Sequence, residues 1–122
     1  MVTNLGLDIQ DINSVEKFIG TSRMSRLFSK NELDYITKKN SAPKTIAGMF
    51  CAKEAFFKAL GTGITNLTEL TKVEIGHDRL GAPRYIISQD LIDKYNLGHA
   101  TLLLSISHTK TVSAAVCCIA IQ

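Results

Sequence analysis

The sequence predicts an α+β fold, in which a small and mainly antiparallel sheet packs around a long central helix. A short apolar stretch near the start has the composition of a strand, several helical patterns follow it, and alternating β-branched stretches fill the second half. The 122 residues are 45% hydrophobic and 20% charged, and no repeat or linker-like tract divides them. We therefore expect residues 1–122 to form a single domain.

The first quarter of the chain is expected to contain one strand and short helices. Residues 5–9, LGLDI, have the composition of a strand. Ser14 precedes apolar residues at helical spacing, so we expect it to cap a helix that ends at Gly20. A further helical turn is expected over residues 23–28.

Two stronger helical signals follow. Ser29 and Glu32 form the pattern of a capping box, which predicts a helix that ends near Lys39. The next helix is predicted over residues 43–60, because Pro43 suits a first helical turn and glycines follow the last one. Its apolar residues surround nearly the whole circumference, which is typical of a helix enclosed by protein.

The second half is predicted to be rich in strands. Residues 73–75 alternate in polarity and are followed by turn-forming residues. Residues 84–87, RYII, then resume as the second strand of a hairpin. Ser88 is expected to cap a short helix that runs through Tyr95. The stretches TLLLSIS and TVSAAVCCIAI then predict two strands that are joined through residues 108–110.

Composition excludes several classes of protein. The net charge of +3 is too small to require a nucleic acid partner, and no nucleic-acid-binding motif accompanies it. The longest apolar run, Ala114–Ile121, is too short to cross a bilayer, and the N-terminus lacks the features of a secretion signal. The three cysteines are expected to be reduced and buried. We therefore expect a cytoplasmic protein with neither a nucleic acid nor a membrane partner.

Two carboxylates stand in unusual surroundings. Asp8 lies inside an apolar strand and Glu54 inside the enclosed helix, where an unpaired charge is costly. A Mg²⁺ ion held by both carboxylates and by phosphate oxygens would compensate them. Alternatively, Glu54 forms an ordinary ion pair with Lys58 one turn later, and Asp8 caps backbone amides. The spacing alone leaves both alternatives open.

Other residues give weaker signals. Lys58 precedes a glycine pair that would let backbone amides approach a phosphate, although Gly61 is also a natural helix end. His108 closes an apolar strand, where it would be reachable as an acid, a base or a ligand, or would be merely structural. His77 and His99 are expected to be solvated turn residues.

Four motifs spread over the whole chain carry a more specific signal: GLDIQDI, FCAKEAFFKALGTGI, GAPRY and LSISHT. Together they resemble the holo-[acyl-carrier-protein] synthase family of 4′-phosphopantetheinyl transferases. The resemblance implies a 4′-phosphopantetheinyl transferase-like fold and a homotrimeric enzyme with active sites between subunits. It also implies Mg²⁺-dependent transfer of 4′-phosphopantetheine from coenzyme A to a serine of an apo acyl carrier protein. The other product would be adenosine 3′,5′-bisphosphate.

The resemblance also implies roles for individual residues. Glu54 would act as the base, while His108 would orient a phosphate. The residues that the motifs assign to metal, phosphate and nucleotide binding are Asp8 and Glu54 for Mg²⁺, Lys58 for phosphate, Gly61, Gly63 and Pro83 for the nucleotide cleft, and His108 and Thr109 beside the phosphates of the coenzyme.

Two positions depart from the family pattern. Ser14 stands where the family often has an arginine that docks the acidic carrier protein, so docking would depend on Arg23 and Arg26. Met49 stands where the family commonly has an arginine, which leaves Lys44 as the nearest candidate for holding the 3′-phosphate of coenzyme A. These departures keep open an alternative function, a non-catalytic module that binds coenzyme A or acyl carrier protein.

Overall fold

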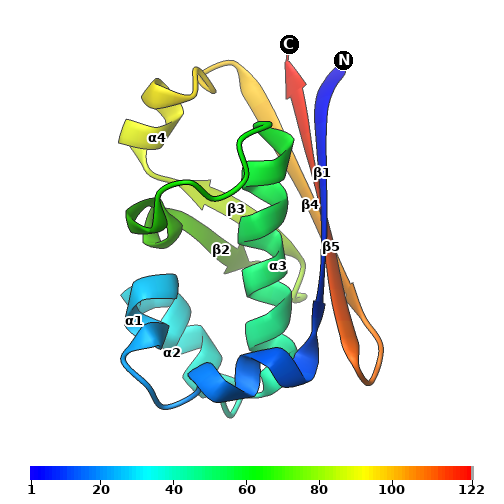
Figure 1. Ribbon diagram of the computed structural model, residues 1–122. Helices are drawn as coiled ribbons and strands as arrows, with labels where there is room; N and C mark the ends of the chain where they lie inside the picture. The colour runs from blue at the N-terminus through cyan, green and yellow to red at the C-terminus, as the bar shows by residue number, and fades with distance from the viewer. Residues whose placement is uncertain (122) are drawn as a thin grey trace.

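A computed structural model describes residues 1–121, in which two antiparallel sheets lie on either side of one long helix (Figure 1). The larger sheet has the strand order β1-β5-β4, with β1 at Val2–Asp11, β5 at Val112–Ile121 and β4 at Ala100–His108. The smaller sheet is the hairpin of β2 (Val73–His77) and β3 (Pro83–Ile87). Between the sheets runs α3, Pro43–Ala59. The predicted α+β class and central helix are confirmed.

The core is built around α3. Eleven of its residues are buried, among them Phe56 and Phe57, so it is enclosed as the sequence predicted. The glycines that follow it, Gly61 and Gly63, have φ angles of +86° and +63°, which non-glycine residues adopt only with strain. The helix therefore ends where the sequence placed its end.

Strand β1 has two different faces. Gly6 and Asp8 are buried against α3. The alternate side chains of Leu5, Leu7 and Ile9 point to the opposite face and are 63%, 63% and 66% exposed. The outer face of β1 therefore exposes a row of apolar side chains.

Three short helices close one end of the molecule: η1 (a 3-10 helix, Ile12–Phe18), α1 (Arg23–Leu27) and α2 (Lys30–Lys38). The predicted capping box of α2 is present, since Ser29 Oγ accepts from Glu32 N and Ser29 N donates to Glu32 Oε1. The expected cap at Ser14 is wrong. The chain enters η1 directly from β1, and Ser14 lies inside this helix with its hydroxyl donating to Asp11 O.

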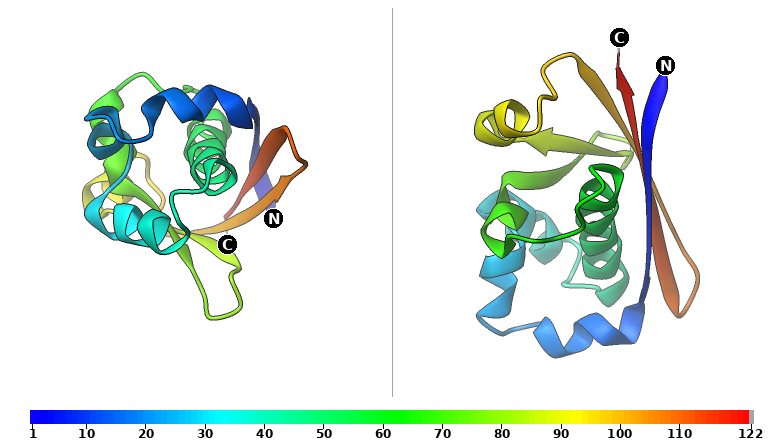
Figure 2. Two further views of the ribbon diagram at one scale, coloured as in Figure 1. Left: turned by 90° about the horizontal axis from the view of Figure 1, so that it is seen from below. Right: turned by 45° about the horizontal axis from the view of Figure 1, so that its top comes forward.

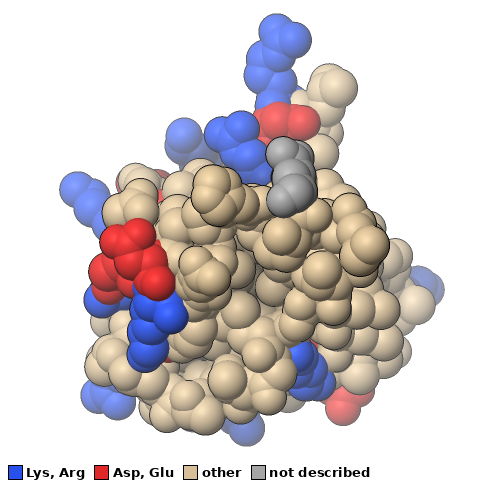
Figure 3. Space-filling view, turned by 90° about the horizontal axis from the view of Figure 1, so that it is seen from above, with Lys and Arg blue, Asp and Glu red and all other residues tan. Residues whose placement is uncertain are grey.

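The hairpin projects from the body of the protein, as the left view of Figure 2 shows. It leads into α4 (Gln89–Lys94), while η2 (Leu67–Lys72) connects α3 to β2. Charged side chains gather over α4 at the left edge of Figure 3, and the centre of that face is mostly uncharged. Ser88 precedes α4 as predicted, but its hydroxyl donates to Asp90 rather than accepting from the backbone.

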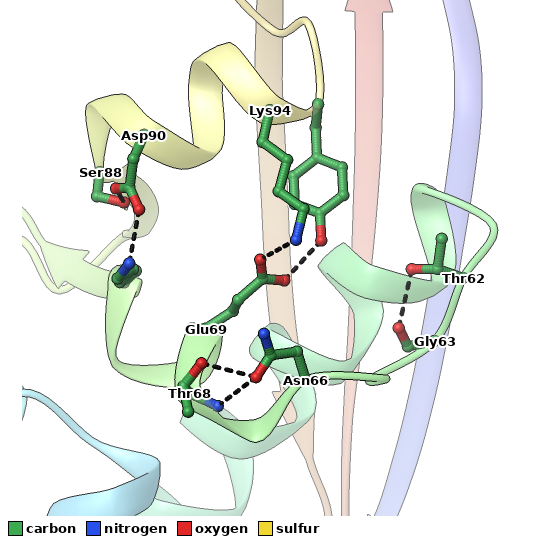
Figure 4. A network of polar contacts seen from close by, with 10 residues as sticks. Thr62, Gly63, Asn66, Thr68, Glu69, Ser88, Asp90 and Lys94 are labelled. Carbon is green, nitrogen blue, oxygen red and sulfur yellow. Dashed lines mark hydrogen bonds and ion pairs between the residues drawn. The ribbon is translucent and has the colours of Figure 1, made fainter.

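A buried carboxylate ties η2 to α4 (Figure 4). Glu69 accepts hydrogen bonds from Lys94 Nζ and from the Tyr95 hydroxyl, both at 2.6 Å. A second pair, Lys72 with Asp90, lies in solvent nearby and contributes little to stability.

Two of the three cysteines are buried as predicted, and the third is only half-buried. Cys51 and Cys117 are buried, Cys118 lies on the other face of β5, and all three are free thiols. Within residues 1–121, no helix is both long and apolar enough to cross a membrane.

Candidate active site

Close contact between β1 and α3 positions the first candidate residue. A Cβ atom added to Gly6 would lie 2.0 Å from Ala55 O, so only glycine lets the strand approach the helix this closely. Asn4 Nδ2 donates to Ala59 O and holds the strand further along the same helix. Asp8, two residues after Gly6 on the same face, is thereby pressed against α3.

The Asp8 carboxylate accepts hydrogen bonds from two side chains. Lys58 Nζ donates to Oδ1 at 2.9 Å, and Gln10 Nε2 donates to Oδ2 at 3.1 Å. The hydrogen bond and the charge of Asp8 raise the pKa of Lys58. Asp8 is therefore hydrogen-bonded to Lys58, the residue that the sequence proposed as a phosphate ligand. Both of these partners are side chains, so these contacts do not support an aspartate that only caps backbone amides.

Glu54 lies beside the same group. Burial raises its pKa, and the negative charge of nearby Asp8 raises it further, against the opposing effect of Lys58. Lys58 bonds to Asp8, and no ion pair joins it to Glu54 in the described part of the chain. The geometry thus brings Asp8, Glu54 and Lys58 together but does not form the simple pair of Glu54 with Lys58.

The carboxylates of Asp8 and Glu54 suit a Mg²⁺ ion that is also bound by the phosphates of a substrate. Mg²⁺ prefers oxygen ligands and is commonly bound by one or two carboxylates, with substrate phosphates and water completing its shell. Asp8 and Glu54 supply two such carboxylates, and their mutual repulsion favours a cation between them. Burial raises the pKa of the nearby Cys51 thiol to about 12, so it stays protonated. Among residues 1–121, no cluster of three or more histidine, cysteine or acidic residues forms an all-protein metal site.

A cavity of about 420 Å³ opens beside Glu54. Arg23 and Arg26 line it from α1, and the Arg23 guanidinium lies 4.2 Å from the centre of the Phe18 ring. The remaining lining residues are apolar: Leu27, Phe50, Ile64, Leu67 and Leu70. The two arginines proposed for docking therefore stand at the same cavity as a candidate catalytic carboxylate.

Three of the candidate nucleotide residues, Pro83, His108 and Thr109, line cavities at the other end of α3, apart from Gly61 and Gly63. Pro83 and His108 line a cavity of about 180 Å³ together with Lys44 and Met49. Lys44 and His108 also line a neighbouring cavity of about 620 Å³, which includes Thr109. Met49 is fully buried, so Lys44 supplies the positive charge at this place on α3.

The two groups of candidate residues are separated within one chain. At a rise of about 1.5 Å per residue, Lys44 and Glu54 lie about 15 Å apart along the axis of α3. Gly61 and Gly63 follow the far end of the helix. The N–H groups of Gly61 and Gly63 donate to Lys58 O and Phe57 O, so both glycines close the helix with their backbone.

Two features of the structure were not predicted from the sequence. His77 is not a solvated turn residue: it lines the cavity of Pro83, and its ring stacks on Tyr35. Lys53 is completely buried and forms an ion pair with buried Glu32 at 2.7 Å. The one available signal for Lys53 was its place in a helix that is apolar nearly all the way round.

Comparison with known proteins gives a uniform result. A family model described as the 4′-phosphopantetheinyl transferase superfamily matches residues 4–117. A curated holo-[acyl-carrier-protein] synthase of Treponema denticola is 37% identical over 119 residues, covering 95% of this chain and 96% of that protein.

Solved structures agree. The chain is similar to a holo-(acyl-carrier-protein) synthase from Bacillus anthracis in complex with CoA (3′,5′-ADP), with a TM-score of 0.83, 30% identity, and coverage of 100% of this chain and 99% of that one. It is also similar to a holo-[acyl-carrier-protein] synthase from Neisseria meningitidis, with a TM-score of 0.86, 27% identity, and coverage of 98% and 99%.

Proposed function

This chain belongs to the holo-[acyl-carrier-protein] synthases of the 4′-phosphopantetheinyl transferase superfamily, and from this we propose that it transfers 4′-phosphopantetheine from coenzyme A to a serine of an apo acyl carrier protein. The observation that carries the proposal for the site is the contact of Gly6 with α3, which brings Asp8 to Lys58 and Glu54. The group of two carboxylates and a lysine suits transfer of a phosphoryl group.

Asp8 and Glu54 would hold Mg²⁺ in this proposal. The ion would neutralise negative charge on the pyrophosphate oxygens of coenzyme A. Lys58 is about half exposed at the same place, so its ammonium group is available to the transferred phosphoryl group. The serine oxygen forms a bond to phosphorus, the bond from phosphorus to the bridging oxygen breaks, and adenosine 3′,5′-bisphosphate leaves with that oxygen.

Glu54 is the proposed base that accepts the serine proton, directly or through a water molecule. The Glu54 carboxylate lies beside Asp8 and Lys58, the residues proposed to hold Mg²⁺ and the phosphates, so it is placed to take up a proton released there. His108 is exposed at the end of β4, beside the nucleotide cavities rather than beside Asp8. We therefore assign His108 to orienting phosphate.

The adenosine end of coenzyme A would lie against Pro83, His108 and Thr109. Lys44, shared by both nucleotide cavities, is proposed to bind the 3′-phosphate in place of an arginine at position 49. Gly61 and Gly63 would shape the cleft near Lys58.

A homotrimer with sites between subunits would unite the separated residues. Leu5, Leu7 and Ile9 offer an exposed apolar surface on the outer face of the larger sheet, and such a surface is suited to contact with another copy of the chain. In such a trimer, Lys44 of one subunit would lie beside Asp8 of the neighbouring subunit. Light scattering tests this: a stable, active monomer at micromolar concentration would refute it.

Arg23 and Arg26 would dock the acidic carrier protein. Both are exposed and line the mouth of the cavity beside Glu54, so a carrier protein bound there would present its serine near the carboxylates. The enzyme is proposed to act in the cytoplasm, where its three free thiols would stay reduced.

Intact-mass spectrometry of the carrier protein tests the function. With Mg²⁺ and coenzyme A, the mass of an apo acyl carrier protein should increase by one phosphopantetheine group. No such adduct across several carrier proteins, although coenzyme A binds, would favour the alternative of a non-catalytic binding module.

A further inference from the structure

The rings of Tyr35 and His77 stack face to face at the cavity that contains Pro83. Their centres are 3.9 Å apart and their planes differ by 3°. Tyr35 belongs to α2, whereas His77 is the last residue of β2 and pairs with Pro83 across the hairpin. The stack therefore joins α2 to the base of the β2–β3 turn.

A second tie lies one helical turn earlier. Glu32 Oε2 accepts a hydrogen bond from Ile75 N at 3.0 Å. Residues three apart on a helix, and residues two apart on a strand, point in similar directions, so Glu32 and Tyr35 meet Ile75 and His77 in register. The Glu32–Ile75 tie is buried in the core, and the Tyr35–His77 stack stands at the wall of the cavity.

The stack is what holds the His77 ring. Its Nδ1 atom is buried and has no hydrogen-bond partner in the described chain. Burial and the charge of Lys39 lower its pKa, while Asp78 opposes them, so the ring is neutral at neutral pH. A neutral imidazole packs on the tyrosine ring as an aromatic partner.

The turn that follows His77 is stiff in itself. Asp78 Oδ1 accepts hydrogen bonds from Leu80 N and Ala82 N, and Asp78 N donates to Ala82 O. Because the hairpin projects from the body (Figure 2), the contact at its base sets the position of the whole turn.

The cavity has the size of a site for one flat ring system. Its volume of about 180 Å³ is below the range of roughly 300 to 1,000 Å³ that is typical of pockets for whole drug-sized ligands. His77 and Pro83 line it from the hairpin, and Gly48 and Met49 line it from α3. The distance between these walls determines whether a heterocycle fits.

We propose that the Tyr35–His77 stack positions the hairpin wall of the cavity so that it receives the adenine base of coenzyme A. This inference rests on the proposed function. Tyr35 and His77 are positioning residues in it, because they fix the wall and act on affinity rather than on the phosphoryl transfer beside Asp8.

The test compares two apolar replacements of one residue. His77→Phe keeps a stacked ring, and His77→Leu removes it while keeping an apolar side chain. Leu80→Ala, at the exposed tip of the same turn, is the control. Calorimetry measures binding of adenosine 3′,5′-bisphosphate and of the ribose bisphosphate that lacks the base, and steady-state kinetics give kcat and the KM for coenzyme A.

We expect the Kd for adenosine bisphosphate to be about three- to tenfold higher in His77→Leu than in His77→Phe, the range of one aromatic pair. KM for coenzyme A should rise in parallel, with kcat and binding of the ribose bisphosphate unchanged. A difference below twofold between Phe and Leu, or an equal loss for both ligands, would overturn the proposal. Failure of the unmodified protein to bind adenosine bisphosphate would instead refute the proposed function.

Discussion

Replacing Lys53 by methionine should destabilise the protein by about 3 to 5 kcal/mol at neutral pH. Lys53 Nζ is fully buried and donates to Glu32 Oε1, Leu70 O and Val73 O at 2.7, 2.7 and 2.8 Å. Methionine fills similar space but leaves two buried carbonyls without this donor and one buried carboxylate without its cation. An exposed ion pair would be worth only about 0 to 1 kcal/mol.

The loss should depend on pH in a defined direction. Burial already raises the pKa of Glu32, and Lys53 lowers it. Removing Lys53 raises the pKa of Glu32 further, and a raised carboxyl pKa means that the folded state binds a proton more readily than the unfolded state. The destabilisation of Lys53→Met relative to the unmodified protein should therefore shrink as the pH falls from about 7 towards 5.

Urea denaturation at fixed protein concentration measures both effects. Lys72→Met, which removes an exposed partner of Asp90, is the matched control and should change stability by less than about 1 kcal/mol. A loss of stability below about 1 kcal/mol for Lys53→Met, or a loss that grows in acid, would refute the stabilising role assigned to the buried Lys53–Glu32 pair.

Four further variants test the site. Asp8→Asn and Glu54→Gln should each lower kcat by about 100-fold or more and alter the Mg²⁺ dependence while leaving the protein folded; an unchanged Mg²⁺ titration would contradict the shared metal site. Gly6→Ala should cost about 1 to 3 kcal/mol and much of the activity, because its Cβ would overlap the backbone of α3; circular dichroism and kinetics check both effects. Charge reversal of Arg23 and Arg26 to Glu should raise the KM for carrier protein and flatten its salt dependence, whereas a rise in the KM for coenzyme A would assign them to the nucleotide site.

Local patterns predicted most of the elements. The capping box of Ser29 and Glu32 fixed the start of α2, and the apolar circumference of residues 43–60 identified the enclosed helix. These signals succeed because hydrogen bonds and burial within a few residues decide them. The predicted cap at Ser14 was wrong because η1 begins at Ile12, directly after β1, so Ser14 lies inside the helix.

Tertiary contacts explain what the sequence did not predict. Glu32 was predicted as a capping residue, but its role as the partner of Lys53 depends on residues 21 positions apart. His77 was expected in solvent because its neighbours form a turn, and it is held by a tyrosine from another element. Spacing along the chain could not reveal either contact.

The sequence named candidate site residues but did not indicate how they are arranged in space. Asp8, Glu54 and Lys58 do meet, although they stand on two elements. Pro83 and His108 line one cavity, and the length of α3 separates this cavity from the carboxylates. The proximity of Arg23 to Glu54 likewise depends on how α1 folds back on the core.

The two faces of β1 make the site sensitive to strand register. A slip of one residue along β5 would turn Leu7 and Ile9 towards α3 and Asp8 outwards. The glycine contact would be lost at the same time, so the misaligned strand would meet the helix with a leucine side chain. A one-residue insertion between Gly6 and Asp8 should thus abolish the site, whereas residues added ahead of Met1 would leave the paired segment in frame.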